Sequence, residues 1–251
     1  MQRRCAALAA AYLAIVLVHL VLLAADHPAA RWTKWLLMPV LLAVVVLAST
    51  RPTNLWAGPQ RRGMVLLAVA ITASWAGDVL LGVSFAIGLA AFAAAHVAYL
   101  ALFLGPARAR RSLTWAAAGY LVWIAVLMPV LWPHLDELAF AVAAYAVLLA
   151  ATAAAATGVN GTTGVGGLLF LASDSLLAFR IFYPDFTDLF PDPWQDLTIM
   201  ALYCAGQGLM ALGVLRHLHV RAAERQPGRV APVTTGPPAN ENLHQRSTQN
   251  P

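Results

Sequence analysis

Residues 63–104 read GMVLLAVAITASWAGDVLLGVSFAIGLAAFAAAHVAYLALFL and contain one formally charged side chain, Asp78. The stretch is about twice as long as the roughly 20 apolar residues that an α-helix needs to cross a bilayer. A short segment, Gly82-Val83-Ser84, divides it into two apolar runs, 63–83 and 85–104. The stretch therefore predicts two transmembrane helices joined by a tight turn.

The same pattern extends over most of the chain. Of the 251 residues, 61% are hydrophobic and 11% are charged, whereas about a quarter of the residues of a soluble domain are charged. Further apolar runs predict spans at 5–25, 34–50, 112–132, 137–157, 163–182 and 197–219. We therefore predict an all-α integral membrane protein, with about eight transmembrane helices in one bundle over residues 1–221.

The charged residues predict how this bundle is oriented. Arginines precede the first predicted span and follow the second, fourth and eighth, whereas aspartates such as Asp185 and Asp188 gather in the loops of the other side. By the positive-inside rule, both termini are expected to be cytoplasmic in a multi-pass protein of the cell membrane. Because the arginines lie at span ends and not on a soluble face, no nucleic-acid partner is predicted. Residues 222–251 are rich in Pro, Gly, Asn and Gln and predict a disordered cytoplasmic tail.

Asp78 and Asp174 are the two acidic residues well inside apolar spans. A charge at the centre of a membrane helix costs at least about 2.5 kcal/mol on insertion scales, so such residues usually have a function. The two aspartates lie at similar depth on spans that run in the same direction, which allows one shared site. The alternative is that each carboxyl group is simply protonated or hydrogen-bonded to a neighbouring helix.

Several other polar residues inside spans are candidates for the same site. His96 and Tyr99 are three residues apart and lie on a similar helix face, as do Tyr203 and Gln207, which are four apart. Each of these side chains has an alternative role in packing or in hydrogen bonding between helices. Ser173 precedes Asp174 and has the alternative of bonding to its own backbone. Lys34 begins the second span, where a lysine either extends to the interface or contacts a lipid phosphate.

Several catalytic motifs are absent from the sequence. It contains no G-x-S-x-G nucleophile elbow, no phosphate-binding G-x-x-x-x-G-K-[ST] loop and no H-E-x-x-H zinc pair. One histidine and two aspartates inside the membrane could still supply three ligands to a metal ion. We predict no metal site and keep this arrangement as an alternative.

The order and separation of several motifs resemble the lysoplasmalogenase-like membrane proteins, which are the bacterial YhhN type and its animal relatives. The similarity covers roughly residues 30 to 215, and Trp35 departs from it because family members often carry a proline after the lysine. The motifs that carry it are Lys34 with Leu37-Met38-Pro39, Ser74–Leu81, Phe85 to Phe103, Leu169–Leu177, and Tyr203 with Gln207.

The resemblance implies an eight-helix hydrolase of the vinyl-ether bond of lysoplasmalogens, with an ether-lipid or lysophospholipid substrate drawn from the bilayer. Asp78 and Asp174 match the essential carboxylates of the family, and no cofactor is implied. The remaining candidates would contact the substrate or support the carboxylates; they are Lys34, His96, Tyr99, Ser173, Tyr203 and Gln207.

The chemistry of vinyl-ether cleavage fits two buried carboxyl groups. The reaction begins with protonation of the β-carbon and passes through an oxocarbenium-like ion that water captures. Burial in a low dielectric favours a protonated carboxyl group, and a second carboxylate can stabilise the cation and orient the water. We expect one aspartate to be the general acid and the other to activate water, without an assignment of the two roles.

Two other classes of protein share these features. A proton-coupled transporter of small molecules or lipids would use two carboxylates and a histidine as a proton relay. A lipid-binding or scaffold protein without catalytic activity would use the aspartates only to bond helices together. In the hydrolase, substitution of either aspartate by asparagine should abolish hydrolysis in a folded protein. The transporter should be catalytically silent and show uptake that depends on a pH gradient, and in the scaffold the same substitutions should change only stability.

Overall fold

The computed structural model describes residues 2–51, 53–109 and 114–225. Within these ranges it is all-helical, and eight helices are long and apolar enough to cross a membrane, as the sequence predicts. They are α1 (Gln2–Ala24), α2 (Ala30–Ser49), α3 (Arg61–Leu80), α4 (Phe85–Leu104), α5 (Thr114–Leu131), α6 (Ala139–Ala156), α7 (Gly161–Phe182) and α9 (Trp194–Glu224). The connections include two 3₁₀ turns, Trp132–His134 and Asp136–Leu138, and the short α8 (Phe186–Leu189).

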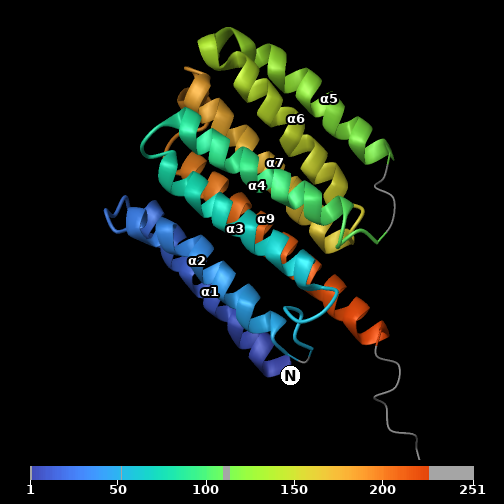
Figure 1. Ribbon diagram of the computed structural model, residues 1–251. Helices are drawn as coiled ribbons and strands as arrows, with labels where there is room; N and C mark the ends of the chain where they lie inside the picture. Colours follow the sequence, from blue (N-terminus) through green and yellow to red (C-terminus); the bar gives the residue numbers. More distant parts are fainter. Residues whose placement is uncertain (1, 52, 110–113, 226–251) are drawn as a thin grey trace, which may run out of the picture.

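The long helices form one bundle (Figure 1). One row consists of α2, α3, α4 and α6, each in contact with the next. Behind it, α9 packs against α7 and α1, and also contacts α2 and α3. Helix α5 closes the far end of the bundle against α6 and α7. The central position of α9 brings its polar residues next to those of α3 and α7.

Apolar side chains cover the outside of the bundle, which is typical of a lipid-facing surface. Leu17 and Val21 of α1 and Val126 of α5 are each more than 60% exposed, although all three are aliphatic. In a bilayer, this exposure stabilises the spanning state, because lipid tails replace water around these groups. The protein is therefore a multi-pass membrane protein.

The two ends of the bundle differ in charge. The arginine-rich end carries Arg61, Arg62, Arg108, Arg221 and Arg225, and the acidic end carries Asp185, Asp188, Asp192 and Asp196. The distribution follows the predicted orientation, but the side of the membrane that each end faces stays a prediction.

Helix α9 ends later than the sequence suggests. It runs to Glu224, whereas its span was predicted to end at residue 219 and the tail to begin at residue 222. The expected disordered tail falls mainly on residues 226–251, which lie outside the described residues, as do Arg110 and Arg111. The disorder of the tail stays a prediction.

Two glycines allow α7 and α9 to approach each other closely. A Cβ atom on Gly166 would lie 2.7 Å from the backbone nitrogen of Met210, and one on Gly206 would lie 2.9 Å from that of Phe170. Real Cβ atoms essentially never approach backbone this closely. The contact places Asp174 of α7 and Tyr203 of α9 within the same layer of the bundle.

We predict that Gly166→Ala destabilises the protein by about 1–3 kcal/mol, because an added methyl group forces two backbones apart. The matched control is Gly119→Ala on α5, where a Cβ atom would meet nothing within 4 Å. Thermal unfolding in detergent measures both variants. Equal melting temperatures for the two would contradict the close packing of α7 on α9.

Candidate active site

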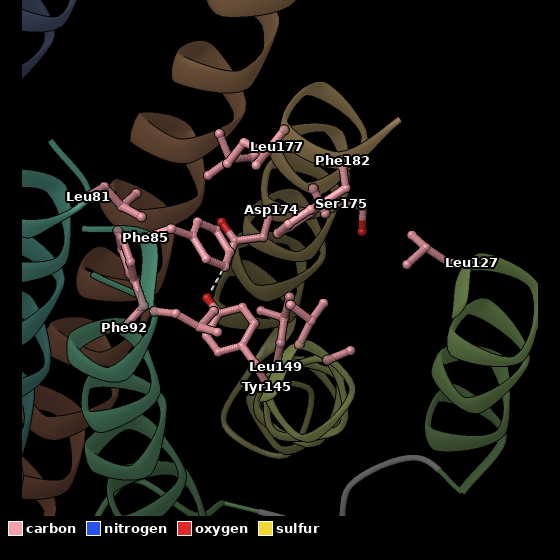
Figure 2. Close-up of a pocket in the computed structure, with 15 residues that line it drawn as sticks. Leu81, Phe85, Phe92, Leu127, Tyr145, Leu149, Asp174, Ser175, Leu177 and Phe182 are labelled. Atoms are coloured by element: carbon pink, nitrogen blue, oxygen red, sulfur yellow. Dashed lines mark hydrogen bonds between the residues drawn. The ribbon is translucent and has the colours of Figure 1, made fainter. Parts of the chain in front are cut away.

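A pocket opens between α4, α5, α6 and α7 in the half of the bundle nearer the acidic end (Figure 2). It has an empty volume of about 610 Å³, part of which is open to the surroundings. Most of its lining is apolar, including Phe85 and Phe92 of α4, while Leu127 projects from α5 on the opposite side. The polar lining residues are Asp174, Tyr145 and Ser175. The pocket therefore offers an apolar chamber with one carboxyl group on its wall.

Asp174 lies in a chain of three polar side chains. Its Oδ2 is hydrogen-bonded to the hydroxyl group of Tyr145, drawn as a dashed line in Figure 2. The same hydroxyl group lies 3.2 Å from Nε2 of His96, a side chain that is 1% exposed. Asp174 itself is half-buried, because it faces the pocket. The chain connects the pocket wall to a histidine inside the bundle.

The hydrogen-bonded chain of Asp174, Tyr145 and His96 can hold its protons in two ways. If Asp174 is ionised, the Tyr145 hydroxyl group donates to it and accepts a hydrogen bond from His96 Nε2. If Asp174 is protonated, it can donate to Tyr145, which then donates to an unprotonated Nε2. Within the described residues, Nδ1 of His96 is buried without a hydrogen-bond partner. A proton can therefore be present on the carboxyl group or absent from it without breaking the chain.

Asp78 belongs to a second, more enclosed group of polar side chains. It is 7% exposed and accepts a hydrogen bond of 2.7 Å from the hydroxyl group of Tyr203. Its charge interacts with Lys34 of α2, and the charges of Asp78 and Asp174 also interact with each other. The two aspartates thus belong to one electrostatic site but have different hydrogen-bond partners and different access to the pocket.

Aromatic rings lie between these two groups. Phe170 packs edge-on against His96 at 5.0 Å and against Tyr203 at 5.5 Å between ring centroids. Phe92 lines the pocket and also packs edge-on against Tyr203, at 6.3 Å. These rings add apolar surface between the two hydrogen-bonded groups, and electrostatic interactions are stronger in such a low-dielectric medium.

Tyr99 and Gln207 form a third polar group. The Tyr99 hydroxyl group donates to Oε1 of Gln207 at 2.5 Å, and Nε2 of Gln207 donates to Ser74 at 2.9 Å. All three side chains are buried, and none lines the pocket. Their hydrogen bonds join α3, α4 and α9, so these residues hold the helices that carry Asp78, His96 and Tyr203.

The structure does not bring Ser173 into the site. Its hydroxyl group donates to the carbonyl oxygen of Ile199 at 2.9 Å and joins α7 to α9. Ser173 does not line the pocket, because its side chain lies on the face of α7 that packs against α9. Ser175 does line the pocket and accepts a hydrogen bond of 3.1 Å from the Trp123 side chain.

Tyr145 is the site residue that sequence reasoning missed. Its span is built mostly of alanine and other small residues, which indicated only close helix packing. The one signal was that Tyr145 is the single side chain in that helix, apart from Thr152, that can donate a hydrogen bond. Phe92 and Phe170 lie in motifs that carry the family resemblance, but they were not predicted for the site, because apolar rings are ordinary in a membrane helix.

The described residues bring no three His, Cys, Asp or Glu side chains together in a group that could hold a metal ion. His96 is joined to Asp174 through Tyr145 and not through a shared ligand position. The arrangement is instead suited to proton transfer, because each link is a hydrogen bond between titratable groups.

Fold and site together define a multi-pass helical membrane protein with a mostly apolar pocket and two aspartates inside the bundle, of which Asp78 is buried and Asp174 faces the pocket. The chain belongs to the YhhN family, whose profile matches residues 29–214.

The names of the curated relatives below all contain the word lysoplasmalogenase. The pig Lysoplasmalogenase TMEM86B is 33% identical over 184 residues, which are 70% of this chain and 72% of the relative. The human Lysoplasmalogenase TMEM86B is 34% identical over 160 residues, 60% of this chain and 64% of the relative. The Lysoplasmalogenase of Mycobacterium tuberculosis is 34% identical over 165 residues, 58% of this chain and 57% of the relative. No solved structure gives a significant match.

Proposed function

We propose that the protein is a hydrolase that cleaves the vinyl-ether bond of lysoplasmalogens to a fatty aldehyde and a glycerophospho-headgroup. The observation that carries the proposal is the half-buried carboxyl group of Asp174 on the wall of a mostly apolar pocket. A vinyl ether is itself apolar and needs a proton donor at its β-carbon. Membership of the YhhN family and the names of the curated relatives support the same reaction.

Asp174 is the general acid in this proposal. It is the aspartate that reaches the pocket, so it can contact the β-carbon of the bound vinyl ether. Transfer of its proton forms a new C–H bond, and the positive charge is shared between the α-carbon and the ether oxygen. The hydrogen-bonded chain through Tyr145 to His96 supports the resulting carboxylate and can return a proton to it.

Asp78 is the carboxylate that stabilises the cation. It is enclosed, bonded to Tyr203 and coupled electrostatically to both Lys34 and Asp174. A negative charge near the oxocarbenium-like ion lowers the barrier most in a water-poor site. Water then adds to the α-carbon and loses a proton, and the hemiacetal breaks its bond to the glycerol oxygen. The products are an aldehyde and an alcohol, so the atoms balance.

Lys34 is the proposed contact for the phosphate of the lysolipid. It is half-buried near the acidic end and interacts electrostatically with His19, Asp78 and Asp196. His19 is 1% exposed, and its Nε2 has no hydrogen-bond partner within the described residues. A phosphate group could accept from both side chains. The lysolipid would enter sideways from the bilayer, and its hydrocarbon chain would lie in the pocket.

The test uses purified protein in detergent and lysoplasmenyl-ethanolamine, with release of fatty aldehyde as the readout. The matched control is the alkyl lysolipid, in which a saturated ether replaces the vinyl ether and no carbon can accept the proton. Aldehyde from the first lipid and no cleavage of the second support the proposal. Folded protein that releases no aldehyde would contradict it and would favour another lipid substrate or proton-coupled transport.

We predict that Tyr145→Phe lowers kcat about 10- to 100-fold and leaves KM nearly unchanged. The substitution keeps the ring that lines the pocket but removes the hydroxyl group between Asp174 and His96. A hydrogen bond to a charged group contributes about 1.5–3 kcal/mol, which corresponds to this range of rates. The control is Tyr120→Phe on α5, which does not line the pocket. Full activity of Tyr145→Phe would exclude the relay.

A further inference from the structure

A second cavity lies at the arginine-rich end of the bundle, where α3 begins and α4 and α9 end. It has an empty volume of about 430 Å³, partly open to the surroundings. Helix α4 separates the two cavities along its length, because the active-site pocket is lined by Phe85 to Phe92 at its start and this one by Gly105 just past its end. The lining residues are Pro59, Gln60, Gly105, Pro106, Leu218, Arg221 and Arg225.

Two arginines of α9 give this cavity a positive charge. Arg221 and Arg225 are four residues apart and therefore lie on one face of the end of α9. Nη2 of Arg221 donates to the carbonyl oxygen of Arg108 at 2.7 Å, which fixes that side chain beside the cavity. Among the described residues of this end, Glu224 is the one acidic side chain, and it does not line the cavity. Among the described residues, no carboxylate lines the cavity beside these two guanidinium groups.

The start of α3 lies next to the same cavity, because Pro59 and Gln60, which precede the helix, line it. The helix begins at Arg61 after Gln60, and no side chain caps its first backbone N–H groups. Such uncapped groups, with the positive end of the helix dipole, favour an anion. The Gln60 side chain lines the cavity, is 8% exposed, and makes no hydrogen bond within the described part of the chain. The amide group of Gln60 is therefore available to donate a hydrogen bond to a ligand in the cavity.

We propose that this cavity binds the phosphate group of an anionic membrane lipid. Arg221, Arg225 and the Gln60 amide would donate to the phosphate oxygens. Leu218 and Pro106 offer apolar contacts for the glycerol and the first carbons of the chains. The cavity lies at the end of transmembrane helices, which is the depth of lipid headgroups, and basic pockets between such helices suit anionic lipids. This site is separate from the active site and does not depend on the hydrolase proposal.

The experiment measures binding of short-chain lipids to the full-length protein in detergent. Dioctanoyl phosphatidylglycerol supplies an anionic lipid, and dioctanoyl phosphatidylcholine is the zwitterionic control. We expect the anionic lipid to bind at least about tenfold more tightly and to raise the melting temperature. Arg225→Gln should weaken this binding about tenfold, because one charge-assisted hydrogen bond is lost. Gln60→Leu, which keeps the size of the side chain, should weaken it to a smaller extent.

The control variant is Arg216→Gln, which removes an exposed arginine of the same helix that does not line the cavity. Equal binding of the two lipids, or equal weakening by Arg216→Gln and Arg225→Gln, would overturn the proposal. Inorganic phosphate and glycerol 3-phosphate form a further arm. Binding of either one as tightly as the anionic lipid, with loss in Arg225→Gln, would overturn the lipid as the ligand and assign the site to a soluble phosphate.

Discussion

Asp174→Asn is expected to lower the rate of aldehyde release about 10²- to 10⁴-fold, which is the usual contribution of a general acid. The asparagine amide keeps the shape of the carboxyl group and its oxygen can still accept from Tyr145, so the helix bundle should fold. It has no proton to deliver to a carbon atom. Binding of the lysolipid should be retained, because the apolar lining of the pocket is unchanged. The measurement is kcat and KM for lysoplasmenyl-ethanolamine.

The matched control is Asp188→Asn in α8, which removes an exposed aspartate from the same end of the bundle. We expect it to have wild-type activity and stability. Folded Asp174→Asn protein that keeps a tenth or more of the wild-type rate would exclude Asp174 as the general acid.

Asp78→Asn is expected to have the second large effect, also a loss of about 10²- to 10⁴-fold in kcat. The substitution removes the negative charge near the developing cation, while the amide oxygen can still accept from Tyr203. Asp78→Ala should differ from it, because the Tyr203 hydroxyl group would then be buried without a partner, which costs about 1–3 kcal/mol of stability. Aldehyde release and thermal unfolding, measured on both variants, separate the two effects.

The outcome of Asp78→Asn also separates a hydrolase from a structural role. If Asp78 only joins α3 to α9, the asparagine variant should lose some stability and keep its activity. A stable Asp78→Asn protein with normal kcat would contradict the role of this carboxylate in the reaction. Loss of activity with an unchanged melting temperature is the result that we expect.

The number and order of the membrane helices could be predicted from the sequence. Residues 85–104 form α4 with the predicted bounds, and the turn at Gly82-Val83-Ser84 joins it to α3. Apolar runs of this length are decisive, because a bilayer leaves the backbone no alternative to helical hydrogen bonds. The late end of α9 could not be predicted, since residues beyond the membrane are not held to an apolar composition.

The site could be predicted only in part. Asp78, Asp174 and His96 stand out because charged and polar groups are costly inside a membrane, and the structure couples them. Their partners depend on which helices are neighbours, and an apolar sequence does not encode neighbours in its periodicity. Tyr145 lies on α6, next to α4 and α7 in space, although the predicted spans gave no reason to join these three. Ser173 was predicted for the site because it adjoins Asp174 in the sequence, but its side chain faces α9.

The pocket also bears on the choice between a hydrolase and a proton-coupled transporter. A proton-coupled transporter needs carboxyl groups that titrate during transport, and the chain from His96 to Asp174 would serve it equally well. The apolar lining beside Asp174 favours a lipid as the molecule that receives the proton. The distinction between these functions is whether a proton moves to a carbon atom.

That distinction is tested most directly by carrying out the reaction in D₂O. Purified wild-type protein would be supplied with lysoplasmenyl-ethanolamine, and the aldehyde trapped at once and analysed by mass spectrometry. Protonation of the vinyl ether by an exchangeable carboxyl group predicts one deuterium on the carbon next to the aldehyde group. Folded protein that forms no aldehyde, or forms aldehyde without deuterium at that carbon, would contradict the proposed mechanism.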